Sequence, residues 1–147
     1  MNKILLLSLI LVSSPLLAQT WTSSANIPSG RHHPITFSLS GKGYSVTGTS
    51  SANVPTKDVY DYDPVTNTWG TLPTFPGLSR SFGIGAVADS LAYIGFGAST
   101  TQYLRDFWSF DASDSSWTRL ADCPCVGRRH PAMIAIGNRI YVGLGDG

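Results

Sequence analysis

Residues 57–69 have the sequence KDVYDYDPVTNTW. Tyr60 and Tyr62 alternate with polar residues, which is the pattern of a β-strand with one buried face. The segment DPVTNT at 63–68 is rich in turn-forming residues, and Trp69 opens the next apolar segment. The stretch therefore predicts two successive strands joined by a short turn.

The same pattern recurs along the chain with a period of 48 residues. The segment DVYDYD at 58–63 is followed 48 positions later by DFWSFD at 106–111. Further positions keep a spacing of 48 or 49: Trp21, Trp69 and Trp117; Pro28, Pro76 and Pro124; Arg31, Arg80 and Arg128; Tyr44, Tyr93 and Tyr141. Such self-similarity indicates one supersecondary unit, repeated over about 21–68, 69–116 and an incomplete 117–147.

Each repeat is expected to contain four short strands. The Arg that opens a repeat precedes an apolar run such as FGIGAVA at 82–88, then a turn, then a strand such as LAYIGFG at 91–97. The third and fourth strands follow the pattern of 57–69, and the chain would begin in such a fourth strand at 21–25. With fifteen Gly, nine Pro, three Lys and no Glu, the composition disfavours exposed helices. We therefore predict an all-β chain with about ten strands between residues 31 and 147.

Composition and charge exclude several classes of protein. Lys plus Arg number 10 and Asp plus Glu number 9, so the formal net charge is +1. A chain with so few charges lacks the basic footprint of a nucleic-acid-binding protein and the polybasic segment of a membrane-surface protein. The apolar content of 42% is too high for a disordered chain.

The amino end has the pattern of a secretory signal peptide. A positive start, an apolar run over 4–12 and a small residue at Ala18 predict a signal over 1–18 and a mature region over 19–147. A membrane anchor is the alternative, although the apolar run is short for a bilayer. We expect no membrane span after signal removal and a secreted, periplasmic or cell-surface location.

These repeats resemble the kelch repeat, especially that of exported bacterial kelch proteins in the galactose oxidase-like superfamily. The resemblance rests on the opening Arg, the strand ends YIGFG at 93–97 and YVGLG at 141–145, the DP turn and the final Trp. The usual two adjacent glycines are split, and the first repeat keeps only Gly48. The positions expected to be structural are Trp69, Trp117, Tyr93, Gly95, Gly97, Tyr141, Gly143 and Gly145.

The resemblance implies a kelch β-propeller, in which each repeat forms one four-stranded antiparallel blade. The chain would supply about two and a half blades, as the N-terminal part of a longer protein. Assembly of several copies of a short chain is the alternative.

The resemblance also places the loops before the first strand and after the second strand at the rim of the central channel. The candidate ligand-binding residues there are Arg31, His33, Arg80, Arg128 and His130. Guanidinium groups bind carboxylates and sugars through paired hydrogen bonds, but these arginines could instead bind carbonyls of the blades. His33 and His130 occupy the position of Phe82, so packing is their alternative role.

Cys123 lies at the repeat position of Ile27 and Phe75, which favours a buried apolar role. A disulfide with Cys125 and a metal site are the alternatives. Three His and two Cys are too few for a zinc site, so no metal or cofactor is expected, and no residue is assigned as catalytic.

The sequence favours a non-catalytic module that binds a protein or a carbohydrate, with no nucleic-acid partner. The resemblance offers two alternatives, a sugar-active enzyme similar to sialic-acid mutarotases and, less favoured, a copper oxidase of the galactose oxidase type. The oxidase would require a Tyr–Cys pair, and Cys123 and Cys125 lie at the wrong repeat position for it.

Overall fold

The computed structural model describes residues 20–147, so the expected signal over 1–18 lies outside the described residues. Within residues 20–147 the chain forms strands, turns and loops but no helix, which confirms the all-β prediction. No helix capable of crossing a bilayer is therefore found in this range. The strands are β1 (Arg31–His32), β2 (Ile35–Leu39), β3 (Lys42–Val46), β4 (Thr49–Ser50), β5 (Val59–Asp63), β6 (Thr68–Leu72), β7 (Ile84–Ala88), β8 (Leu91–Gly95), β9 (Phe107–Asp111), β10 (Ser116–Leu120), β11 (Ala132–Ile136) and β12 (Arg139–Gly143).

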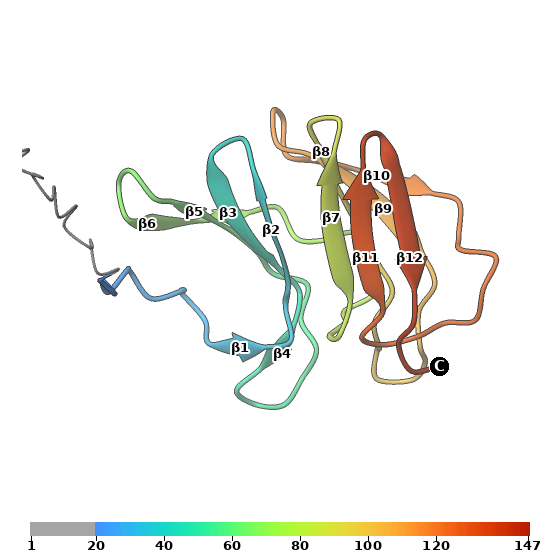
Figure 1. Cartoon of the computed structure of the whole chain (residues 1–147). Helices are drawn as coiled ribbons and strands as arrows, with labels where there is room; N and C mark the ends of the chain where they lie inside the picture. The colour runs from blue at the N-terminus through green and yellow to red at the C-terminus, as the bar shows by residue number, and fades with distance from the viewer. Residues whose placement is uncertain (1–19) are drawn as a thin grey trace, which may run out of the picture.

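These strands build two complete blades and half of a third (Figure 1). The first blade has the order β2-β3-β5-β6, the second has the order β7-β8-β9-β10, and the third consists of β11 and β12. All pairings within the blades are antiparallel. The innermost strands β2, β7 and β11 lie side by side, as expected for successive blades around one axis. The ten five-residue strands are those that the sequence predicts, and the two-residue pair β1–β4 is additional.

Antiparallel alternation places all the long loops at one end of the disc. The turns within β2–β3 and β5–β6 lie at the opposite end, as do their counterparts in the second blade. We call the end with the long loops the loop end. It carries the segments 47–58 and 96–106 between second and third strands, and the segments 73–83 and 121–131 between blades.

The apolar core lies between the first and second blades. Two clusters of buried side chains form it: Ile35, Val46, Val59, Phe75 and Ile94; and Leu39, Tyr44, Ala92 and Phe110. Trp117 contacts both clusters, with its ring centroid 5.1 Å from that of Phe75 and 4.6 Å from that of Phe110. The repeated tryptophan of the second blade therefore helps to join the two blades.

The strand expected over 21–25 is not formed, and Trp21 is fully exposed. A strand is stabilised by pairing with a neighbour, and no described strand runs beside this segment. Its hydrogen bonds reach the outer edge of the first blade: Ala25 N donates to Asn67 Oδ1, and Trp69 Nε1 donates to Ala25 O. The 48-residue spacing of Trp21 was therefore not sufficient to predict a strand.

The strand ends that differ from the usual kelch pattern have an unusual backbone. Thr47, Phe96 and Leu144 each have φ of 61°, and each precedes a glycine with positive φ. A side chain on Gly97 would collide with the carbonyl oxygen of Ser81, so this position requires glycine for space as well as for φ. Gly95 and Gly97 are buried, whereas Tyr141 and Gly145 in the third blade are exposed.

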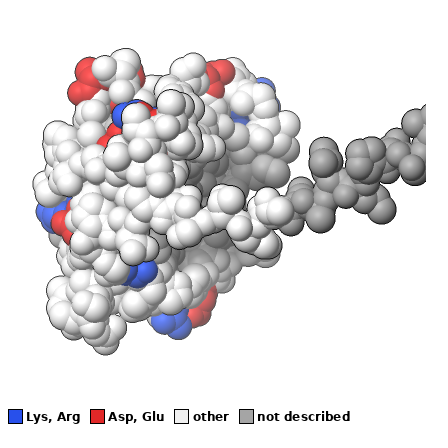
Figure 2. Space-filling model, turned by 90° about the vertical axis from the view of Figure 1, so that its left-hand side faces the viewer, with Lys and Arg blue, Asp and Glu red and all other residues white. Residues whose placement is uncertain are grey.

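Two sides of this structure differ in the kinds of side chain that they expose to solvent. Figure 2 views the side nearest the first blade and shows only scattered charged side chains there. On the opposite side, Ile134 pairs with Tyr141 across β11 and β12, and both residues are exposed, as is Ile136. The outward face of the third blade is therefore open to solvent and mainly apolar, with Arg139 opposite Ile136.

Candidate ligand-binding site

Arg80 is completely buried and binds only groups of the protein. Its Nε donates to Leu78 O at 3.1 Å, and Nη1 donates to Phe96 O at 3.2 Å. Nη1 and Nη2 each lie 2.6 Å from a carboxylate oxygen of Asp106, in a bidentate pair. Arg80 therefore ties the start of the second blade to the loop that follows β8.

Arg31 repeats this arrangement in the first blade. Its Nε donates to Ser29 O at 3.2 Å, Nη1 donates to Thr47 O at 2.9 Å, and Nη2 donates to Asp58 at 3.1 Å. Its side chain is only 2% exposed.

Arg128 makes the corresponding two carbonyl contacts, with Val126 and Leu144. In residues 20–147 no carboxylate pairs with Arg128.

The three guanidinium groups each bind loops of their own blade. Of the two roles that the sequence left open, these hydrogen bonds support the structural one. The acidic partners Asp58 and Asp106 are 48 residues apart, so the repeat contained a signal for them that the sequence interpretation did not use.

Asp106 is held in its charged form. Burial by itself would raise the pKa of this carboxyl, but the hydrogen bonds and charge of Arg80 outweigh burial and lower it. Trp108 Nε1, which donates to Asp106 Oδ2 at 2.8 Å, lowers the pKa further. The Arg80–Asp106 pair is therefore a fixed ion pair and offers no free charge to a ligand.

The structure does bring together His33, Phe82 and His130, which precede the innermost strands of the three blades. The ring of Phe82 lies 4.3 Å from that of His33 and 4.8 Å from that of His130, measured between centroids. The backbone links them as well: Phe82 N donates to His33 O, and His130 N donates to Phe82 O. All three residues have positive φ, between 50° and 61°. We call these three residues the axial ring group.

The axial ring group presents both apolar ring surface and nitrogen atoms at the loop end. His33 and His130 are exposed, and Phe82 is half-buried. Desolvation lowers the pKa of His33, and the neighbouring His32 and His130 lower it further. A neutral imidazole such as that of His33 can donate one hydrogen bond, accept another and pack against a ligand. In the described part of the chain they form no cluster of three metal-ligating side chains.

Cys123 and Cys125 form a disulfide with each other. The sequence favoured a separate apolar role for Cys123, and the disulfide was one of the alternatives. The Cα atoms are 5.2 Å apart, within the range that a disulfide spans. Cys123 N also donates to Arg105 O, so this loop is joined to the loop between β8 and β9.

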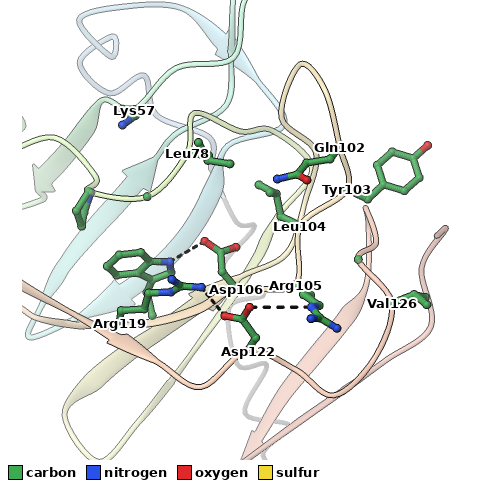
Figure 3. A pocket seen from close by; sticks show the side chains of 14 residues that line it. Lys57, Leu78, Gln102, Tyr103, Leu104, Arg105, Asp106, Arg119, Asp122 and Val126 are labelled. Carbon is green, nitrogen blue, oxygen red and sulfur yellow. Dashed lines mark hydrogen bonds and ion pairs between the residues drawn. The ribbon is translucent and has the colours of Figure 1, made fainter.

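The loop end has a second feature, which was not predicted from the sequence. A hollow of about 770 Å³ lies beside the second blade, with Lys57, Arg105, Arg119 and Asp122 among its lining residues (Figure 3). Arg119 and Asp122 stand where the first blade and the segment after it have Thr71 and Thr74, so the repeat pattern does not reveal them.

The four-stranded blades arranged around one axis define a segment of a β-propeller. The chain is 29% identical over 137 residues to a protein of Aspergillus terreus described as kelch-like protein terF, and the match covers 84% of this chain and 29% of that protein. No family model matches the chain.

A solved structure, described as the structure of YjhT, is also similar. Its TM-score is 0.76 at 18% sequence identity, over 87% of this chain and 48% of that one. This likeness concerns the fold. The chain spans less than half the length of either protein.

Proposed function

We propose that this chain is part of an exported, non-catalytic kelch propeller that binds a protein or carbohydrate ligand at its loop end. The observation that carries the proposal is the axial ring group, in which side chains from three successive blades meet and leave His33 and His130 exposed. Loops on a rigid scaffold are the usual place for binding residues. Export is supported by the signal pattern of residues 1–18 and by the Cys123–Cys125 disulfide, which suits an oxidising compartment.

Binding is favoured over catalysis because the carboxylates beside the repeated arginines are already held in ion pairs. Asp106 is paired with Arg80 and Asp58 with Arg31, so neither carboxylate is free to act as an acid or base. The alternative function is a sugar-active enzyme similar to sialic-acid mutarotases, and the observation in its favour is the lowered pKa of His33, which keeps an imidazole neutral and able to accept a proton. A copper oxidase is less favoured because Cys123 and Cys125 are joined to each other.

The test uses the full chain against a glycan array and a random peptide library. The double variant His33→Ala/His130→Ala should weaken binding of the selected ligand at least about tenfold, the effect of losing one or two hydrogen bonds. Its melting temperature should stay unchanged, since both side chains are exposed. Trp21→Ala, which alters a fully exposed residue distant from the axis, is the control. Wild-type binding by the double variant would contradict the proposed axial site.

A further inference from the structure

The hollow beside the second blade is formed by three main loops of the loop end, and the segment 47–58 adds Lys57. It is bounded by the loop before β7, by the loop between β8 and β9, and by the loop after β10 (Figure 3). Its wall includes Trp108 of β9 and Arg119 of β10, the two outer strands of the blade, and none of the axial ring group. It is therefore a separate feature, off the propeller axis.

The charges in the hollow are unbalanced. Arg119 Nη2 lies 2.6 Å from one oxygen of Asp122, and Arg105 Nε lies 4.0 Å from the other. Two guanidinium groups thus share one carboxylate, as Figure 3 shows. Asp106 lines the hollow too, but its charge is neutralised by Arg80. Lys57 adds a further cation, which has no ion pair within residues 20–147.

The positively charged side chains that line the hollow are accessible to a ligand. The side chains of Arg105 and Arg119 are each 56% exposed, and each guanidinium has N–H groups beyond those that face Asp122. Guanidinium groups with spare donors bind carboxylates strongly and with defined geometry.

The lip of the hollow is apolar and mainly aliphatic. Leu78 is 50% exposed and Val126 is 65% exposed, which are high values for such side chains. Tyr103 is also exposed, but Arg129 lies over its ring, 5.5 Å from the centroid. Sugars stack best on open aromatic faces, whereas leucine and valine suit the apolar side chains of a peptide.

Contacts within the protein order the residues that line the hollow in the absence of a ligand. The Arg119 guanidinium lies over the ring of Trp108, which is itself hydrogen-bonded to Asp106. Cys123 N donates to Arg105 O at 3.0 Å, and the Cys123–Cys125 disulfide closes the adjoining loop. A site that is already ordered loses less conformational entropy on binding.

We propose that this hollow binds an acidic peptide segment of a partner protein. A carboxylate of the segment lies between Arg105 and Arg119, and a neighbouring apolar side chain packs on Leu78 and Val126. The inference rests on the proposed function, that the loop end is a binding surface, and it specifies the partner class and a second position on that surface.

The experiment selects peptides from a random octapeptide display library with the full chain and with variants. Wild type should enrich peptides that combine Asp or Glu with an aliphatic residue. Arg119→Glu should weaken binding of a selected peptide at least about tenfold, because it removes a charge-assisted hydrogen bond and adds a repulsive charge. Asp122→Asn should strengthen binding several-fold, because it neutralises the carboxylate that the two arginines share.

Arg139→Glu is the matched control. It makes the same change in net charge as Arg119→Glu, at an exposed residue of β12 that does not line the hollow. It should leave peptide affinity unchanged, and thermal melting should show that all variants fold.

Three outcomes would overturn the inference. Peptides that bind equally to wild type and Arg119→Glu but are lost in His33→Ala/His130→Ala would support the axial site and exclude the hollow. Binding of a uronate- or sialate-containing glycan through Arg119, without peptide enrichment, would replace the peptide by a sugar. Absence of any peptide or glycan binding would contradict both proposals.

Discussion

At the scale of single residues, the ion pair of Arg80 and Asp106 illustrates how burial sets the importance of a charge. The Arg80 side chain is 0% exposed, so removal of its partner leaves a cation without compensation inside the protein. We expect Asp106→Ala to lower the free energy of unfolding by about 3–5 kcal/mol, as is usual when a buried pair is broken. Urea denaturation of the full chain measures this change.

Asp58→Ala provides the comparison for that prediction. Asp58 is 41% exposed and makes one hydrogen bond to Arg31, which keeps its carbonyl contacts when the carboxylate is lost. The loss of stability should therefore be clearly smaller. Both arginines are buried, so equal losses for the two variants would show that the bidentate contact and the lower exposure of Asp106 do not make the second pair more important for stability.

The same pair predicts a pH dependence. The pKa of Asp106 is lower in the folded chain than the ordinary value near 3.8, so its contribution to stability is fully present above that value. This contribution is lost as the pH falls through the folded pKa. The difference in unfolding free energy between wild type and Asp106→Asn should thus be constant near neutrality and shrink below about pH 4. Denaturation series at several pH values measure it, and a pH-independent difference would contradict the ion pair.

Thr47 allows a test of backbone strain. It has φ of 61°, where a β-branched residue is unfavourable, and its buried Oγ1 has no hydrogen-bond partner. Thr47→Ala and Thr47→Gly remove the same hydroxyl and differ by one methyl group, but only glycine accepts this φ without strain. We expect the glycine variant to be more stable than the alanine variant by about 1 kcal/mol. Thermal melts compare the two variants, and a more stable alanine variant would argue against the left-handed backbone.

At the scale of strands, Trp117 and Trp69 share a repeat position but differ in their surroundings. Trp117 on β10 contacts both core clusters between the blades, whereas Trp69 on β6 packs on Tyr62 and donates to Ala25 O. We expect Trp117→Ala to cost about 3–5 kcal/mol of stability and Trp69→Ala to cost less. Chemical denaturation of the two variants gives the comparison, in which a larger loss for Trp69→Ala would place the main core elsewhere.

The strands were predictable because their signals are local. Apolar alternation and turn residues within each 48-residue unit mark the five-residue strands, and the axial ring group follows from His33 and His130 sharing a repeat position with Phe82. Contacts between residues distant in sequence were harder to predict. Arg80 and Asp106 are 26 residues apart, and their pairing depends on how the loop after β8 returns toward β7.

Two further features could not be inferred from the repeat. The first is the absence of a strand at Trp21. A strand forms only beside a neighbouring strand, and the spacing of the tryptophans does not show whether such a neighbour is present. The cluster of Arg105, Arg119 and Asp122 depends on the meeting of β10 and two loops, and two of its members have no charged counterpart 48 residues earlier. The positions at which the repeats differ thus indicate candidate binding residues, whereas the positions that they share indicate the fold.

At the scale of the whole molecule, the outward face of the third blade is unlike the rest of the surface. Ile134, Ile136 and Tyr141 are 59%, 61% and 48% exposed, and they share one face of the β11–β12 pair. Contiguous apolar surface of this kind, on a two-stranded sheet with free edges, promotes association. We expect the 147-residue chain by itself to self-associate through this face at micromolar concentration.

The double variant Ile134→Lys/Ile136→Lys should shift the chain toward monomer, because it places two positive charges on the face where copies would meet. Sedimentation velocity over a range of concentrations measures the change. Val65→Lys is the control, since Val65 is 91% exposed but lies in the turn between β5 and β6, away from this face. If both variants reduced association equally, added net charge would be the cause and not the loss of the apolar face. If neither variant did, the copies would associate through another surface, and the axial end or the first blade would be the next to test.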